Sequence, residues 1–225
     1  MSKKHTIVKK YEPWDPRGRT KVYYDAEQLA RIESVKQDVS EQLAPKPRRL
    51  AHSLSVANTA EHLATIYGVD PFLARIAGLL HDWDKVTPRD ELVAHARELG
   101  IDLGVPLERV EPLLHGKVTA LDLPERYEWV PQEVWHAISC HTTADTHMSP
   151  LDKVLFVADG IEPGRPASEG IQSTRALVSA VSLDDLFWHS FVGGLVYVLE
   201  GGRYLYPGAI EIYNALAQTR AQAKK

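Results

Sequence analysis

The sequence is poor in cysteine, which limits the covalent and metal chemistry open to it. Cys140 is the only cysteine among the 225 residues. A single thiol excludes an internal disulfide and any zinc site built on paired thiolates, and it is typical of a protein kept in a reducing compartment. The chain also holds ten histidines, which favours metal chemistry through nitrogen and oxygen atoms over sulfur.

Long apolar runs and a strong net charge are also missing. No stretch reaches the ~18 uninterrupted apolar residues of a membrane span, and the first ten residues contain no signal-peptide core. The formal net charge is −4 and the basic residues are scattered, which argues against a nucleic-acid-binding face. We therefore expect a cytoplasmic protein that has neither nucleic acid nor a membrane as its partner.

The composition is that of one globular domain. Hydrophobic residues make up 44% of the chain and charged residues 25%, which is enough to build a sizeable core at this length. Residues 1–25 mix lysines, prolines and aromatics without any periodic pattern, so we expect a tail or a strap there. Residues 26–222 are expected to form the single domain.

Apolar residues recur at helical spacing through most of the chain, and alternating strand patterns are scarce. Capping residues mark several helix starts, at Asp70, Thr87, Ser149 and Ser182. The apolar stretch 186–199 is too short to cross a bilayer and is expected to be a buried helix. The pattern predicts an all-α bundle, with helices near residues 26–43, 48–67, 71–83, 88–99, 107–121, 131–140, 150–160, 170–180, 183–200 and 208–222.

The sharpest local signal is an apolar helix that runs into the pair His81-Asp82. A buried carboxylate without a partner costs several kcal/mol, so Asp82 needs a partner or a proton. A metal ion would be one good partner. The alternative is an ion pair with Lys85, three residues further along the chain. Four more polar side chains lie at the edges of apolar segments, at His52, His115, His141 and Asp159.

These donors define the class of metal but not its identity. Histidine nitrogen together with carboxylate oxygen suits iron, manganese, nickel, zinc or magnesium better than copper(I). The residues alone leave the choice among these metals open.

Several ordered motifs resemble those of the HD-domain metal-dependent phosphohydrolases. His52, His81-Asp82 and Asp159 have the order and approximate spacing of that pattern. More narrowly, the chain resembles the YqeK family from about residue 48 to 217, through RLAH at 49–52, GLLHD at 78–82, LHG at 114–116, HTT at 141–143, MSPLDK at 148–153 and ADGIEPGR at 158–165. That family has an all-helical fold and contains symmetrical bis(5′-nucleosyl)-tetraphosphatases.

The resemblance implies a site with two metal ions. One ion would be held by His52, His81, Asp82 and Asp159, and the second by Asp82 as a bridge together with His115 and His141. It implies iron first, with manganese, nickel, cobalt or magnesium as alternatives. Two such ions typically lie ~3.5–4 Å apart and activate a water molecule while they bind phosphate oxygens.

The resemblance also implies a reaction. Metal-bound hydroxide would cleave the small-molecule substrate diadenosine tetraphosphate into two ADP molecules. Asp82 and Lys85 are the candidates for catalysis. Arg49, Lys85 and Arg165 are the candidates for binding the substrate phosphates, since cationic side chains pair with phosphate oxygens.

Other functions and roles stay open at this point. An HD-type nucleotidase or phosphohydrolase acting on another nucleotide is one alternative, and a non-catalytic module that senses a nucleotide is another. The oligomeric state is open, with a homodimer as one alternative. Asp84 departs from the family pattern, and it would either accept an N–H from a ligand histidine or face solvent. Cys140 is interpreted as a small buried apolar residue and Asp152 as a helix cap.

Overall fold

The computed structural model describes residues 22–223, and every regular element in that range is a helix. The predicted all-α class is confirmed. The α-helices are α1 (Ala26–Gln42), α2 (Pro47–Tyr67), α3 (Pro71–Leu80), α4 (Arg89–Glu98), α5 (His115–Asp122), α6 (Gln132–Cys140), α7 (Pro150–Ile161), α8 (Glu169–Leu177), α9 (Leu183–Glu200) and α10 (Gly208–Ala223). Short 3-10 helices are η1 (Trp83–Val86), η2 (Leu107–Arg109) and η3 (Glu111–Leu113). The expected tail, 1–25, lies almost entirely outside the described residues.

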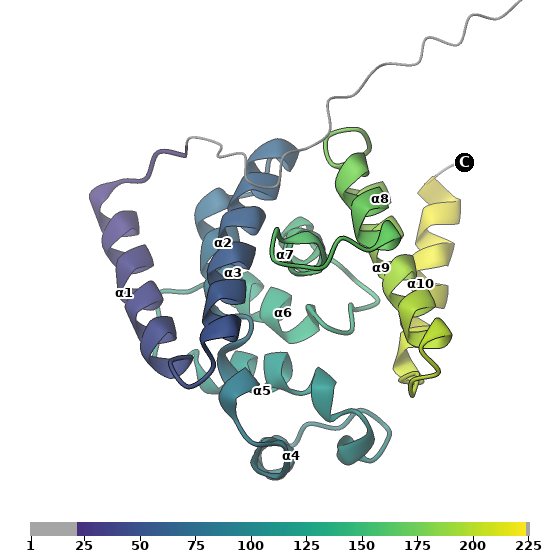
Figure 1. Cartoon of the computed structure of the whole chain (residues 1–225), viewed down its shortest axis with the longest axis horizontal. Helices are drawn as coiled ribbons and strands as arrows, with labels where there is room; N and C mark the ends of the chain where they lie inside the picture. Colours follow the sequence, from purple (N-terminus) through teal and green to yellow (C-terminus); the bar gives the residue numbers. More distant parts are fainter. Residues whose placement is uncertain (1–21, 224–225) are drawn as a thin grey trace, which may run out of the picture.

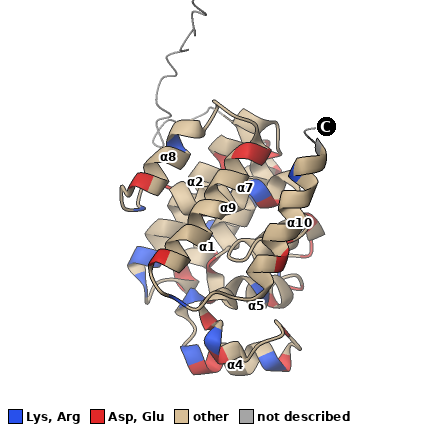
Figure 2. Cartoon of the chain, turned by 90° about the vertical axis from the view of Figure 1, so that its right-hand side faces the viewer, with Lys and Arg blue, Asp and Glu red and all other residues tan. Residues whose placement is uncertain are grey.

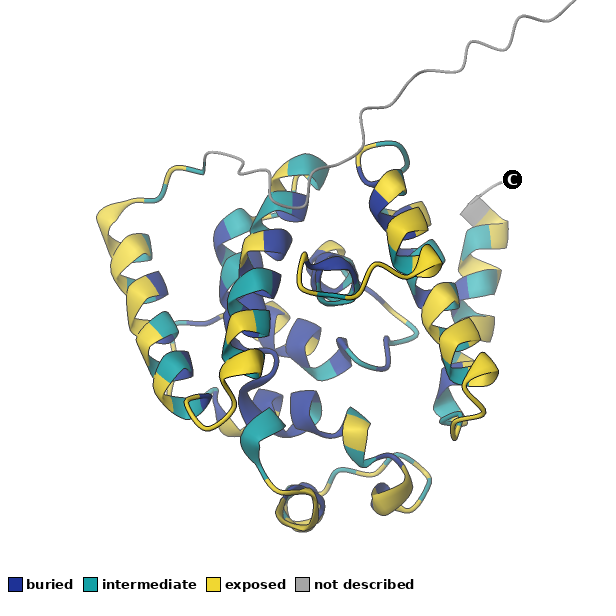
Figure 3. Cartoon of the chain, viewed as in Figure 1, coloured by how far each residue is buried: buried dark blue, intermediate teal, exposed yellow. Residues whose placement is uncertain are grey.

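Helices α2, α3, α6 and α7 form the centre of the molecule (Figure 1). Helix α1 flanks α2 and α3, whereas α8, α9 and α10 lie on the far side of α7, and α4 lies beyond α5. The main core of buried apolar side chains is shared by α1, α2, α3, α6 and α7, and Figure 3 shows the buried positions concentrated there. A smaller core under α4 includes Leu92, Val93, Leu114 and Val118.

Local capping chemistry explains most helix starts. The Asp70 carboxylate accepts hydrogen bonds from the backbone N–H groups of Phe72 and Leu73 at the start of α3, and Ser149 forms a capping box with Asp152 at the start of α7. Both caps confirm the sequence predictions. The predicted cap at Thr87 is wrong, because α4 starts after Pro88 and the Thr87 hydroxyl faces Asp84 instead.

Two helices are shorter than the apolar spacing predicted. Helix α3 ends at Leu80, with His81 as its C-cap, and residues 83–86 turn as a 3-10 helix. The helix predicted over 107–121 is broken into η2, η3 and α5. Pro112 explains this break, since it lacks a backbone N–H and disfavours helical geometry in the residue before it. Both breaks place a histidine at a helix terminus.

Helix α9 is only half buried, so the expectation of a buried helix over 186–199 is wrong. Its first half packs through Phe187 and Phe191 against Phe156 of α7. Its second half extends past the core, and Tyr197 is 64% exposed and Leu199 61% exposed. Figure 2 shows few charged residues along α9 and α10. Even so, no helix within residues 22–223 is both long and apolar enough to cross a membrane.

Candidate metal centre

The structure brings together all six side chains that the sequence singled out as metal ligands. They come from five separate parts of the chain. His52 lies in the middle of α2, and the consecutive residues His81 and Asp82 lie at the end of α3. His115 starts α5, His141 is the C-cap of α6 and Asp159 lies in α7. Asp82 and three of the histidines are at most 2% exposed. Such convergence of buried polar groups needs a physical explanation.

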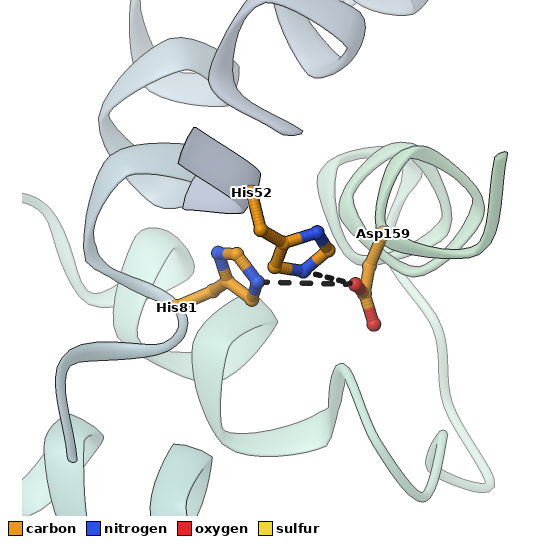
Figure 4. Close-up of side chains that lie close together, drawn as sticks. All are labelled: His52, His81 and Asp159. Atoms are coloured by element: carbon orange, nitrogen blue, oxygen red, sulfur yellow. Dashed lines mark ion pairs between the residues drawn. The ribbon is translucent and has the colours of Figure 1, made fainter. Parts of the chain in front are cut away.

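His52, His81 and Asp159 form one half of the cluster. Oδ1 of Asp159 lies 3.0 Å from Nε2 of His52 and 3.9 Å from Nε2 of His81. Figure 4 shows both rings directed toward this carboxylate. One ligand atom from each of the three residues lies within 4.8 Å of the others, so a single cation could contact all of them.

Asp82 connects this half of the cluster to the other. Its Oδ2 lies 3.7 Å from Nε2 of His52, whereas its Oδ1 lies 3.1 Å from Nε2 of His115 and 4.0 Å from Nε2 of His141. His81 lies between the halves, with Nε2 3.7 Å from the same Oδ1. The two oxygens of one carboxylate thus face different histidines, which is the arrangement a bridging ligand requires.

Each histidine is oriented through its Nδ1 atom. Nδ1 of His52 lies 3.0 Å from Oε1 of Glu162. In the other three, Nδ1 faces a backbone carbonyl oxygen three residues earlier in the chain, with separations of 2.8 Å for His81 and Gly78, 3.1 Å for His115 and Pro112, and 2.6 Å for His141 and Ile138. Because these acceptors need an N–H, we assign a proton to Nδ1 of all four rings. Nε2 of His81, His115 and His141 then keeps a lone pair, whereas Nε2 of His52 also carries a proton and faces the Asp159 carboxylate.

The four Nε2 atoms point at one another and at carboxylates. Nε2 of His115 lies 3.0 Å from Nε2 of His141. The Nε2 atom of His81 is buried and makes no hydrogen bond among the described residues. Buried polar atoms without a partner are costly, and cations between them would remove that cost. The residues present therefore fit a metal centre.

The electrostatics of the site prepare its residues for metal binding. Burial alone would raise the pKa of Asp82, but three facing histidines hold it well below its ordinary value. Burial lowers the pKa of His141 to about 3, and neighbouring histidines add to this effect. Burial also opposes charge on His52, yet contact with Asp159 and Glu162 outweighs it and raises the pKa to about 9. Asp82 is therefore ionised and His141 neutral at pH 7, as metal ligands must be.

Two arginines lie at the more open edge of the cluster. Nη1 of Arg49 is 3.2 Å from Oδ2 of Asp82, and Arg165 donates from Nε to the Asp159 backbone oxygen at 2.9 Å and from Nη2 to its carboxylate. The side chains of Arg49 and Arg165 are 42% and 35% exposed, against 3% for Asp82. Solvent therefore reaches the site from the side of the arginines.

Lys85 does not pair with Asp82, so the alternative of an ion pair between these two residues is wrong. No ion pair joins Lys85 and Asp82 in the described part of the chain, and the Lys85 ammonium lies 3.4 Å from the Pro112 carbonyl oxygen. Burial lowers the pKa of Lys85, while the charge of Asp82 partly opposes that shift. The ammonium thus contributes charge near the cluster without neutralising Asp82 directly.

Both interpretations of Asp84 are also wrong. Asp84 is 9% exposed rather than facing solvent. Its Oδ2 accepts a hydrogen bond from the Thr119 hydroxyl at 2.7 Å, and His81 donates elsewhere. Burial raises the pKa of this carboxyl. Asp84 therefore joins η1 to α5 rather than orienting a ligand.

Glu162 is the residue that the sequence analysis missed. It follows Asp159 by three positions, so both side chains lie on the same side of the end of α7. Its side chain is 3% exposed, accepts from the Gly164 backbone N–H and contacts His52. A carboxylate behind a ligand histidine fixes the ring and increases its basicity.

Comparison with known proteins assigns this chain to a family. The family model described as HD domain matches residues 49–164, and the chain belongs to the HD-domain family. A solved structure from Clostridium acetobutylicum, described as a predicted HD superfamily hydrolase involved in NAD metabolism, matches with a TM-score of 0.74 and 33% identity, covering 83% of this chain and 97% of that one.

The relatives narrow the family further. A protein of Staphylococcus aureus, named bis(5′-nucleosyl)-tetraphosphatase, symmetrical, is 34% identical over 81% of this chain and 93% of its own length. Proteins with the same name from Halalkalibacterium halodurans and Bacillus subtilis are 31% and 29% identical and are covered over 88% and 93% of their lengths. The resemblance to this group, first seen in the motifs, is confirmed.

Proposed function

We propose that this chain is a metal-dependent hydrolase that cleaves diadenosine tetraphosphate symmetrically into two ADP molecules. The observation that carries the proposal is the arrangement of four histidines, each oriented through Nδ1, whose Nε2 atoms converge on two carboxylates. The name carried by the relatives supports the choice of substrate. Hydrolysis of a phosphoric anhydride needs positive charge at the phosphate oxygens, and this site is suited to provide it.

The ligands divide into two sets that share Asp82. We assign His52, His81, Asp82 and Asp159 to the first ion, and Asp82, His115 and His141 would hold the second. When bound, the ions would lower the pKa of water toward about 7 and would supply positive charge to the phosphate oxygens. We assign iron first, on the family resemblance, with manganese, nickel, cobalt and magnesium as alternatives. Loading would release the proton that His52 carries at neutral pH.

The arginines are assigned to the substrate phosphates. Each contacts a carboxylate of the cluster, Arg49 that of Asp82 and Arg165 that of Asp159. Once ions neutralise Asp82 and Asp159, Arg49 and Arg165 are free to bind phosphate oxygens in the bidentate way that guanidinium favours. Lys85, which is half-buried, adds positive charge near the cluster. These three residues would hold one ADP half in register while water attacks the phosphorus beside the central bridging oxygen.

Analysis of the products tests the substrate and the symmetry of cleavage together. Chelator-treated protein is reloaded with iron(II) or manganese(II), incubated with diadenosine tetraphosphate, and the nucleotides are separated by anion exchange. We expect ADP as the sole nucleotide product. AMP together with ATP would overturn symmetrical cleavage. Faster turnover of a deoxynucleotide or a guanosine polyphosphate in the same panel would favour the other HD-type activity.

A pair of histidine variants tests whether the cluster is catalytic. His81→Ala is expected to lose metal and turnover while it keeps its helical circular dichroism. His95→Ala is the control, because His95 pairs with Asp122 near the surface of α4, away from the cluster. Full turnover in a well-folded, metal-supplemented His81→Ala protein would favour the non-catalytic nucleotide-sensing function instead. Elemental analysis of the iron-loaded protein should give two equivalents per chain.

A further inference from the structure

A second group of metal-ligating side chains lies outside the candidate metal centre. His136 and Cys140 are four residues apart on α6, and Asp152 lies in the first turn of α7. Nδ1 of His136 is 3.0 Å from Oδ2 of Asp152 and 4.0 Å from Sγ of Cys140. One ligand atom from each residue lies within 4.8 Å of the other two. The three residues share no ligand with the centre that holds His81.

Asp152 carries an oxygen that the fold leaves without a partner. The residue is fully buried, at 0% exposure. Its Oδ2 accepts from the Ser149 backbone N–H at 2.7 Å and faces His136, but its Oδ1 is buried and makes no hydrogen bond within residues 22–223. Capping α7 therefore explains one oxygen only. A buried carboxylate oxygen without a partner is costly, and the same carboxylate lies within 4.8 Å of a thiol and an imidazole, a set of donors that suits a cation.

The spacing of the donors matches tetrahedral zinc. Zinc bonds of about 2.0–2.1 Å to nitrogen or oxygen and about 2.3 Å to sulfur place neighbouring ligands about 3.3–3.6 Å apart. The observed Nδ1–Oδ2 and Nδ1–Sγ separations of 3.0 Å and 4.0 Å differ from these values by about 0.4 Å or less. The third separation, between a carboxylate oxygen of Asp152 and Sγ, is at most 4.8 Å, so side-chain rotation would have to bring these two donors closer around an ion. The side chain of His136 is 45% exposed, so an ion can enter from that side and keep a water ligand.

We propose that His136, Cys140 and Asp152 form a separate cation site that binds a thiophilic divalent ion such as Zn²⁺. The sulfur binds as thiolate, so its proton is released to solvent when the ion enters. His136 binds through Nδ1 and carries its proton on Nε2. The mixed nitrogen, oxygen and sulfur donors distinguish this site from the candidate metal centre, whose six residues offer nitrogen and oxygen only.

The ion would act as a clamp between two helices that also build the centre. Cys140 directly precedes His141 on the chain, and Asp152 precedes Asp159 by seven residues on α7, which is about 10 Å along the helix. Joining His136 and Cys140 to Asp152 ties the end of α6 to the start of α7 across the connection 141–149. A filled clamp should therefore raise the thermal stability of the whole protein.

Binding of cobalt(II) gives a spectroscopic signal that can come only from this site. The iron-loaded protein is titrated with Co²⁺, and the near-ultraviolet absorption of thiolate-to-cobalt charge transfer is followed. Cys140 is the only cysteine in the chain, so the band cannot come from the candidate metal centre. We expect a saturable band at one Co²⁺ per chain, and Zn²⁺ should displace it.

His136→Ala and its matched control decide the assignment. We expect His136→Ala and Cys140→Ser to lose the band, and His136→Ala to bind one equivalent of Zn²⁺ less than the unmodified chain. His95→Ala should keep both, since His95 has similar exposure, 41% against 45%, and also faces an aspartate, but no thiol lies beside it. His136 is exposed, so its removal should leave the fold intact.

Two results would overturn the proposal. One is the absence of any charge-transfer band in the unmodified chain up to millimolar Co²⁺. The other is a band and a zinc stoichiometry that persist unchanged in folded His136→Ala. Neither readout depends on turnover, so failure of this site is distinguishable from failure of the proposed hydrolase function.

Discussion

Gly116 lies against His141, and one added methyl group there would disturb the centre without removing any polar group. Gly116 is the second residue of α5, which packs against α6. A Cβ atom at this position would lie 2.5 Å from the Ile138 carbonyl oxygen, 2.6 Å from Cε1 of His141 and 2.7 Å from its Nδ1. The Ile138 oxygen and Nδ1 of His141 form the hydrogen bond that orients this ring.

The required displacement follows from these distances. Ordinary contacts of a Cβ atom begin at 3.4 Å, so the ring and the carbonyl must retreat by about 0.7–0.9 Å. His141 is 2% exposed, so its ring cannot relieve the contact by turning toward solvent. Functional sites tolerate about 0.5 Å. We therefore expect Gly116→Ala to lose metal retention and turnover, and to cost about 1–3 kcal/mol of stability from overpacking, partly offset by the better helix propensity of alanine.

Metal content after gel filtration, turnover and urea unfolding together measure these effects. Gly193→Ala is the control, because Gly193 lies within α9 and a Cβ there meets nothing within 4 Å. The control should gain about 0.5–1 kcal/mol and keep its metal. If Gly116→Ala also gained stability and kept both metal and turnover, close packing of α5 on His141 would not constrain the centre, and this reasoning would be refuted.

Three further predictions concern the surroundings of the centre. Glu162→Gln keeps the shape but removes the charge behind His52, so metal affinity measured by competition with a chelator should fall about 10–100-fold; an unchanged affinity would contradict the role of Glu162. In metal-free protein the pKa of His52 is raised to about 9, so protonated His52 stabilises the folded state. This contribution is fully present below pH 6.5 and is lost as the pH rises through 9. The loss should reach at most about 3 kcal/mol by urea unfolding, and it should disappear in metal-loaded protein, where His52 cannot be protonated. Gly78→Ala places a Cβ 2.5 Å from the Ala57 Cα atom, which would push α2 and α3 apart and lower the melting temperature relative to Gly193→Ala.

The parts of the fold that follow from local chemistry could be predicted from the sequence. The caps at Asp70 and Ser149 depend only on a side chain and the two or three residues after it. The polar residues of the centre were recognisable for a similar reason, since each interrupts or ends an apolar segment. Which of them meet is a property of the whole bundle, and there the family resemblance supplied what spacing alone could not.

The errors arose where packing between distant segments decides the outcome. From the sequence, Asp84 is expected to accept from a ligand histidine or to face solvent, because spacing along the chain identifies only near neighbours such as His81. Its partner, Thr119, lies 35 positions further along the chain. Helix α9 is apolar along its length, yet its second half has too little of the bundle beside it to be buried. Periodicity reports which faces can be buried, not how much partner surface is available.

The missed carboxylate Glu162 follows from a simple rule about helix ends. His81 and His141 are C-cap residues, and their Nδ1 atoms face carbonyl oxygens of the last helical turn, which have no N–H partner within the helix. His115 follows a 3-10 turn and uses the same relation to Pro112.

His52 has no such carbonyl available. It lies in the interior of α2, where the carbonyl oxygens accept from the next turn of the helix. A ligand histidine in that position needs an acceptor from another element, and Glu162 at the end of α7 provides it. In an all-helical metal centre, a ligand histidine at a helix end can be oriented by its own backbone, whereas one in mid-helix requires a distant side-chain acceptor. Applied to this sequence, the rule directs attention to an acid one turn beyond a ligand on a facing helix, which is the position of Glu162 relative to Asp159.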